Sequence, residues 1–111
     1  MNLIDATGLA GTNGAIWGTE TEDLDATIVR WEPNLGVAEH TNDEVDVVMT
    51  ILCGGGLAIV NSEPHALVTG QILVIPKGIS REIKANSDGI TYLNVHKRRK
   101  KLLPNMVRPR N

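Results

Sequence analysis

The stretch GQILVIPKGISREI, at positions 70–83, decides the fold. Its strand-like run at 71–75, a Gln followed by four apolar residues, is predicted to be a β-strand and ends in a Pro-Lys-Gly sequence suited to a tight turn. A second strand follows, and alternation along it places Arg81 on the same face as Ile79 and Ile83. We therefore expect Arg81 to point into the apolar interior.

Similar short β-rich runs, separated by turn residues, make up most of the chain, and almost nothing has helical period. The predicted strands are 25–32, 36–40, 46–53, 57–61, 65–69, 71–75, 79–85 and 89–96. The Gly triplet at 54–56 and Asn-Ser-Asp-Gly at 86–89 are expected to be tight reversals. Eight strands joined by hairpins predict an all-β fold, a small closed or two-sheet barrel.

With 111 residues, the chain has room for one domain and one core. Apolar residues make up 41% of it without a single Phe, so the core must be mainly aliphatic. No apolar run approaches the roughly 18 residues of a membrane span, and the first residues lack the order of a signal peptide. We expect a cytoplasmic protein without membrane partners.

The single cysteine, Cys53, excludes an internal disulfide and any multi-cysteine zinc site. It ends the apolar run VVMTILC at 47–53. We expect a buried packing thiol rather than a nucleophile.

Acidic and basic residues are distributed unevenly along the chain. All 13 acidic residues precede position 97, whereas seven of the 11 Lys and Arg lie from Lys97 onward. We expect a loose arm at 1–23, with AIWGTE at 15–20 as a candidate edge strand, a barrel at 24–96 and a basic tail at 97–111. A tail that is solvated or folded against the acidic body needs no partner, and without a visible recognition element nucleic-acid binding is not expected.

An inward-facing Arg81 needs a counter-charge, because burying an unpaired charge costs several kcal/mol. Either a carboxylate or an anionic ligand can supply it. The richest supply of carboxylates is EHTNDEVD at 39–46, which contains Glu44 and Asp46 beside His40. We expect this loop to be the partner of Arg81.

These residues resemble two motifs of the cupin superfamily. Its second motif is Gly, five residues, Pro-x-Gly, two residues, His, and an Asn four positions on. Here Gly70 is followed by the same spacings, but Arg81 stands in place of the His, and Asn86 comes one place late. The resemblance extends from about Asp25 to His96.

The first cupin motif, His-x-His, three or four residues, Glu, six residues, Gly, matches in either of two registers. In one register His40 and Glu44 fit, with Ala38 in place of the first His. In the other, His40 and Asn42 form the pair and Asp46 is the acid, which leaves Gly54 one place late.

The resemblance implies a small jelly-roll-type barrel with a degenerate metal site. Metal-binding cupins hold Fe, Mn, Ni or Zn with three His and one Glu, but this chain keeps only His40 and one carboxylate, Glu44 or Asp46. Arginine has no lone pair free for a metal. We expect no cofactor and an ion pair in place of the ion. The alternatives are a metal held by His40 and Glu44, or a relocated site using His96 or Asp46.

The resulting candidate site consists of His40, Glu44, Asp46, Arg81 and Tyr92, or Asn94 if the other face of the last strand looks inward. His65 and His96 are expected to be ordinary surface or edge residues. The preferred hypothesis is a module that binds a small carboxylate or phosphate through Arg81.

Two other functions stay open. One is a metal-free isomerase or epimerase with His40 as general base, oriented by a carboxylate. The other is a structural scaffold without chemistry. In each case we expect a homodimer, because DVVMTILC at 46–53 offers apolar residues to both faces of its strand.

Overall fold

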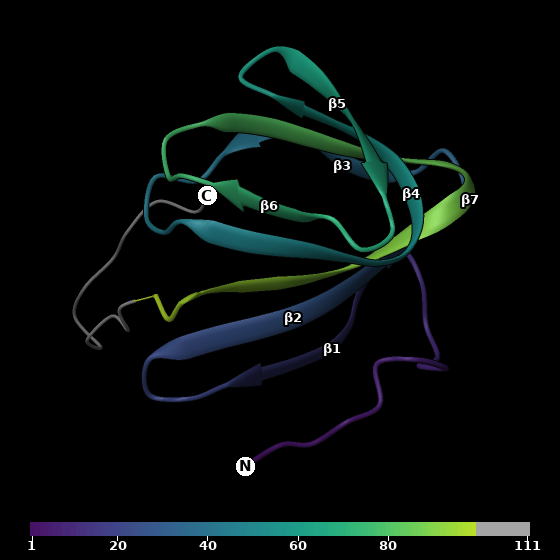
Figure 1. Ribbon diagram of the computed structural model, residues 1–111. Helices are drawn as coiled ribbons and strands as arrows, with labels where there is room; N and C mark the ends of the chain where they lie inside the picture. The colour runs from purple at the N-terminus through teal and green to yellow at the C-terminus, as the bar shows by residue number, and fades with distance from the viewer. Residues whose placement is uncertain (100–111) are drawn as a thin grey trace.

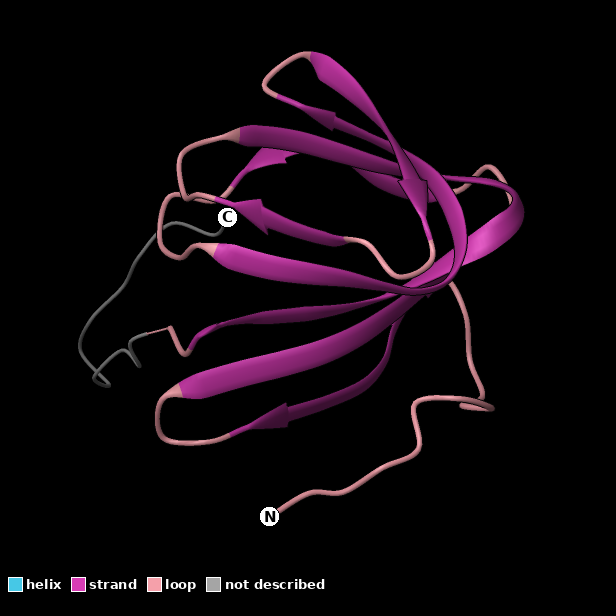
Figure 2. Cartoon of the chain, in the orientation of Figure 1, coloured by secondary structure: helices cyan, strands magenta, loops and turns pink. Residues whose placement is uncertain are grey.

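The structure is a computed structural model that describes residues 1–99, and this part of the chain folds into strands, turns and loops without a helix (Figure 2). Its elements are β1 (Gly14–Glu20), β2 (Leu24–Trp31), β3 (Gly36–Thr41), β4 (Val47–Val60), β5 (Glu63–Val68), β6 (Ile72–Ile75) and β7 (Ser80–Lys97). No helix capable of spanning a membrane occurs in these residues.

The two longest strands, β4 and β7, organise the fold (Figure 1). They pair antiparallel from Val47↔His96 to Val60↔Arg81 and bend together between these ends. One arm of the pair is flanked by β6 on β4 and by β2, then β1, on β7. The other arm is flanked by β5 on β4 and by β3 on β7. The result is a two-sheet barrel of jelly-roll type, as the sequence predicted.

The sequence prediction was wrong at the places where the two long strands bend. The Gly triplet at 54–56 and the segment 86–89 were expected to reverse the chain, but both lie inside continuous strands. Register shifts between Ile51 and Cys53 and between Gly54 and Gly56 bend β4, and Gly54 adopts a φ of 71°. Glycines at bulges allow a strand to turn sharply while its ladder continues. Four predicted strands are therefore the four arms of two bent ones.

The shorter elements agree more closely with the prediction from the sequence. The AIWGTE segment lies in β1, an edge strand paired with β2. Turns occur at 32–35, where the Leu35 amide donates to the Glu32 carbonyl, and at Asn61 and Ser62, which both have positive φ. The Pro-Lys-Gly sequence at 76–78 connects β6 to β7.

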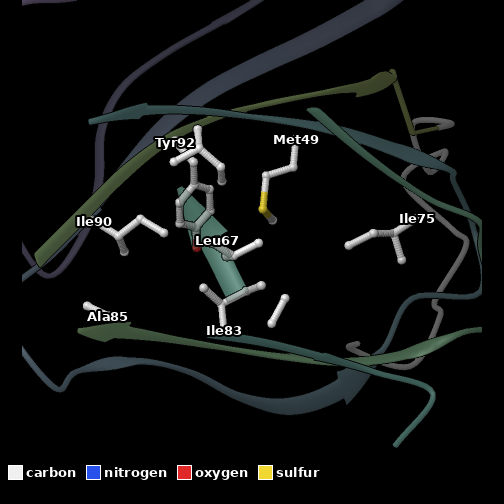
Figure 3. Packing of buried hydrophobic residues seen from close by; sticks show 9 residues of the cluster. Met49, Leu67, Ile75, Ile83, Ala85, Ile90 and Tyr92 are labelled. Carbon is white, nitrogen blue, oxygen red and sulfur yellow. The ribbon is translucent and has the colours of Figure 1, made fainter. Parts of the chain in front are cut away.

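The core lies between the two sheets and is mainly aliphatic, as expected from the composition. Figure 3 shows Met49 and Tyr92 on one side of it facing Ile83 and Ala85 on the other. Alternation along β7 puts Arg81 on the inner face with Ile83, and Arg81 is only 5% exposed. The predicted inward orientation of Arg81 is confirmed.

Cys53 was expected inside the core, but it is exposed. Ile51, two residues earlier, is buried, so simple alternation would have placed Cys53 inside as well. The register shift between these two residues changes the face to which the following side chain points. The prediction was wrong because a bulge is not visible in an apolar run.

The first residues of the basic tail contact the acidic body. Arg98 Nε lies 2.9 Å from Glu20 Oε2, and the Arg98 amide donates to the Asp23 carbonyl at 2.8 Å. Arg99 Nε lies 3.8 Å from Glu44 Oε2. The remaining part of the predicted tail, residues 100–111, lies outside the described residues.

The bend predicts a difference between two glycine substitutions. Gly54 and Gly70 both have positive φ, of 71° and 94°, so alanine strains the backbone at either position, by about 1–2 kcal/mol. At Gly54 the added Cβ would also collide with the Gly89 carbonyl, whereas at Gly70 it meets open space. We expect Gly54→Ala to lower the free energy of unfolding by a further 1–3 kcal/mol or so compared with Gly70→Ala. Urea denaturation measures both values, and equal losses would contradict a close approach of β4 to β7.

Candidate functional site

A cavity of about 300 Å³ lies between the two sheets. Arg81 lines it from near the start of β7, and Asn94 and His96 line it from near the end of the same strand. Because β7 starts and ends on the side opposite its bend (Figure 1), these polar residues lie at the open end of the barrel. Ile83 and Tyr92, nearer the bend, line the apolar interior.

Arg81 is held in the cavity by backbone carbonyls. Its Nε donates to Ile79 O at 3.1 Å, and its Nη2 makes a long contact of 3.5 Å with Pro76 O. Burial lowers the pKa of the Arg81 guanidinium from its usual value, but the group stays charged at physiological pH. Within residues 1–99, Arg81 forms no ion pair with Glu44, Asp46 or any other carboxylate. The prediction that Arg81 forms an ion pair with a carboxylate of the 39–46 loop is therefore wrong.

That loop has a structural role instead. The Asn42 side chain, 6% exposed, accepts hydrogen bonds from the amides of Glu44 and Val45. The Asn42 carbonyl accepts from the Gly78 amide at 2.7 Å, and Asp46 Oδ1 accepts from the Lys77 amide at 2.8 Å. These bonds tie the loop to the Pro-Lys-Gly turn. Glu44 and Asp46, both predicted to bind the ligand, do not line the cavity.

The three histidines have different surroundings. His40 lines the cavity and lies opposite Arg81 in the β3–β7 register, and its Nδ1 is 2.9 Å from Ala38 O. His96 also lines the cavity, and its side chain is only 14% exposed, with Nε2 4.0 Å from Asp25 Oδ2. His65 is exposed on β5, as predicted. His96, expected to be an ordinary surface or edge residue, thus lies beside the cavity.

Tyr92 and Asn94 both face the cavity, because they are two residues apart on one strand. Trp31 Nε1 donates to the Tyr92 hydroxyl at 3.0 Å, which leaves the phenol proton available to an acceptor. Burial raises the pKa of Tyr92, an effect that this hydrogen bond opposes. Tyr92 is therefore a neutral donor at physiological pH.

The residues of the cavity do not fit the metal site that the cupin resemblance implies. No group of three or more His, Cys, Asp and Glu that could hold a metal occurs in residues 1–99. The position of the histidine in the second cupin motif holds the buried cation of Arg81, which repels a metal ion and offers it no lone pair. Of the alternative pair His40 and Glu44, only His40 lines the cavity.

Comparison with solved structures identifies the architecture. An RmlC-like cupin protein from Desulfovibrio desulfuricans aligns over 87% of this chain and 96% of its own, with a TM-score of 0.74 and 14% identity. A cupin protein from Bacteroides fragilis aligns over 96% of this chain and 93% of its own, with a TM-score of 0.68 and 21% identity. The chain has the cupin fold.

A further solved structure has the same fold. KdgF from Halomonas sp. aligns over 78% of this chain and 76% of its own, with a TM-score of 0.69 and 17% identity. No family model and no curated protein matches the sequence. At such identities the likeness shows the cupin fold alone, so the function must be argued from the cavity.

The sequence pointed only weakly, or not at all, to two residues that line the cavity. The sequence does not predict a place for Trp31 in the cavity, because half-buried aromatic residues are common in strands and nothing local links Trp31 to Tyr92, 61 positions away. Asn94 was an alternative to Tyr92, although alternation alone puts both on one face. The signal that could have found it is the polar end of the row Ile90, Tyr92, Asn94 and His96.

The surroundings of Arg81 predict the effect of removing it. Arg81→Met loses the hydrogen bonds to Ile79 and Pro76 but relieves the burial of a charge. We expect these terms to offset each other, so that the free energy of unfolding of the ligand-free protein changes by less than about 1 kcal/mol.

Chemical denaturation of Arg81→Met, with Arg81→Met/Glu44→Gln as control, measures this effect. A loss of about 3–5 kcal/mol in the single variant, recovered in the double variant, would show instead that Arg81 belongs to a buried ion pair.

Proposed function

We propose that this protein binds a small anionic ligand, a carboxylate or a phosphate, in its barrel without a metal. The observation that supports the proposal is Arg81, a charged side chain 5% exposed in a cavity, without a counter-ion among residues 1–99. A buried charge of this kind lowers stability unless something neutralises it. An anion in the cavity would do so.

Donors for such an anion face the cavity. The Arg81 N–H groups not engaged by Ile79 and Pro76 are available for bidentate binding of a carboxylate or phosphate. The Tyr92 hydroxyl proton adds a neutral donor, and His40, opposite Arg81 across the β3–β7 pair, adds a titratable one. No Asp or Glu of the described chain lines the cavity to repel an anion.

The shape of the cavity limits the ligand. A volume of about 300 Å³ lies at the lower end of the range for small-molecule sites. Its apolar interior, near Met49 and Ile83, suits the carbon part of the ligand, whereas the anionic group belongs at the polar end. A small organic acid or phosphate ester has both an apolar carbon part and an anionic group.

The enzyme hypothesis has less support. General-base catalysis by His40 calls for a carboxylate that orients the ring, but the ring contact found for His40 is with Ala38 O. The His–carboxylate pair beside the cavity is His96 with Asp25, at 4.0 Å. A purely structural scaffold gives no reason for a charged side chain in an open cavity. Binding therefore remains the preferred function.

Thermal unfolding with added anions tests the proposal. At 100 times its Kd, a ligand of the native state raises the free energy of unfolding by about 2.7 kcal/mol, or Tm by roughly 10 °C. We expect inorganic phosphate or a small carboxylate such as propionate to produce such a shift in the wild type and none in Arg81→Met. Lys84→Met is the matched control, because it removes one positive charge from the same strand but from an exposed position.

Two results would reject this function. One is an equal Tm shift in wild type and Arg81→Met, which would place the anion elsewhere. The other is elemental analysis showing one Fe, Mn, Ni or Zn per chain in the purified protein.

We also propose a homodimer in the cytoplasm; the location rests on the sequence alone. The dimer is supported by an outer patch, defined here as Val48, Ile72 and Val74 with their neighbour Val95. Ile72 and Val74 are 65% and 66% exposed. Because the patch carries no charge, the same surface on a second copy can pack against it by two-fold symmetry.

Light scattering measures the expected mass of twice the 12.0 kDa chain. Val74→Glu should give the monomer, whereas Val68→Glu, at an exposed valine of β5, should not. A wild-type mass near 12 kDa at high concentration would contradict the dimer.

A further inference from the structure

Arg99 is a second arginine that lines the cavity. It comes two residues after the end of β7, whereas Arg81 is the second residue of the same strand. Because β7 starts and ends on the side opposite its bend (Figure 1), the two arginines approach the open end of the barrel from different arms of the strand. The polar end of the cavity therefore has two permanently positive side chains.

Acidic side chains do not line the cavity, although they are common in the described chain. Residues 1–99 contain 13 Asp and Glu but only seven Lys and Arg. Two of the basic side chains line the cavity, and none of the acidic ones does. A cavity lined by one sign of charge attracts ligands of the opposite sign. This distribution of charge favours a ligand more negative than a single carboxylate.

Both arginines have N–H groups that a ligand can reach. Arg81 Nη1 donates to no acceptor within residues 1–99, and it is not closed to solvent as Asn94 Oδ1 is. The Arg99 side chain is 39% exposed. Its one recorded interaction within the described chain is an ion pair with Glu44.

The ion pair with Glu44 holds Arg99 only loosely. Arg99 Nε lies 3.8 Å from Glu44 Oε2, which is beyond hydrogen-bond distance, and both side chains are partly exposed. Exposed pairs of this kind contribute little to stability, because solvent screens them and the side chains lose freedom in forming them. Arg99 lines the cavity and Glu44 does not. An anion in the cavity can therefore replace Glu44 as the partner of Arg99 at little cost.

We infer that the ligand carries two negative charges, as a phosphate monoester or a dicarboxylate does, and that Arg81 neutralises one of them while Arg99 leaves Glu44 to neutralise the other. This inference rests on the proposed anion-binding function and adds Arg99 as the residue that selects a dianion. A monoanion satisfies Arg81 and leaves Arg99 with Glu44, whereas a dianion provides a counter-charge for both arginines.

Calorimetric titration at pH 8 with pairs of similar shape tests the inference. The pairs are propyl phosphate with propyl sulfate, and succinate with its monoamide, succinamate. At this pH a phosphate monoester, whose second pKa is about 6, is a dianion, whereas the sulfate ester is a monoanion. We expect the dianion of at least one pair to bind the wild type about fivefold or more tightly. A preference in the phosphate pair alone means that both arginines bind one group, and in the succinate pair alone that they bind two ends.

Three variants assign the preference. Arg99→Gln should reduce the affinity ratio to about one. Arg98→Gln is the matched control and should retain the ratio, because Arg98 pairs with Glu20 and does not line the cavity. Glu44→Gln should raise the ratio, because it removes the carboxylate that competes for Arg99, and a misfolded protein would not gain affinity. In Arg81→Met neither member of a pair should bind.

The possible failures are distinguishable. Equal affinities within both pairs in the wild type would overturn the inference and leave anion binding by Arg81 intact. The same holds for a ratio that survives Arg99→Gln, falls equally in Arg98→Gln, or does not rise in Glu44→Gln. No binding of any probe to the wild type would overturn the anion-binding function and this inference with it.

Discussion

The antiparallel pairing of β4 with β7 is the constraint on which the rest of the structure depends. Both strands pass through the bend together, so each contributes one arm to each sheet, and every shorter strand is attached to one of these arms, directly or through β2. The bend is possible only where the backbones approach closely, at Gly54 and Gly56, where a Cβ would collide with β7. A few glycines thus decide that the chain forms a barrel rather than a flat sheet.

The same bend creates the cavity and its polarity. Because β7 doubles back, residues near its two ends meet across the barrel, which brings Arg81 to the same open end as Asn94 and His96. The Asn42 loop, bonded to the Pro-Lys-Gly turn through Gly78, borders this end. Among residues 1–99, Asn94 Oδ1 near this end has no hydrogen-bond partner, whereas buried apolar residues such as Ile90 and Ala85 form a cluster near the bend. The buried apolar cluster near the bend stabilises the barrel, and the proposed binding site lies at the other end.

The sequence predicted the fold well, because alternation and turn residues are local signals. It placed Arg81 inside for the same reason. It failed at Cys53, where a bulge reverses the alternation, and at 54–56 and 86–89, where glycine-containing segments continue a strand instead of ending it. The partner of Arg81 was also mispredicted. Proximity of Glu44 and Asp46 to His40 in the chain says nothing about which way their side chains turn, and Asp46 faces the Lys77 amide instead. Contacts between distant segments depend on register, which no short stretch encodes.

The hydrogen bond between Trp31 and Tyr92 has a practical consequence. The chain contains two tryptophans, and Trp31 lines the cavity whereas Trp17 lies on β1 away from it. The Trp31 indole donates to a phenol that itself faces the cavity. A molecule entering the barrel would change the polarity beside one indole and leave the other in its original surroundings. The protein therefore carries an intrinsic optical reporter, with its own internal reference, for whatever occupies its centre.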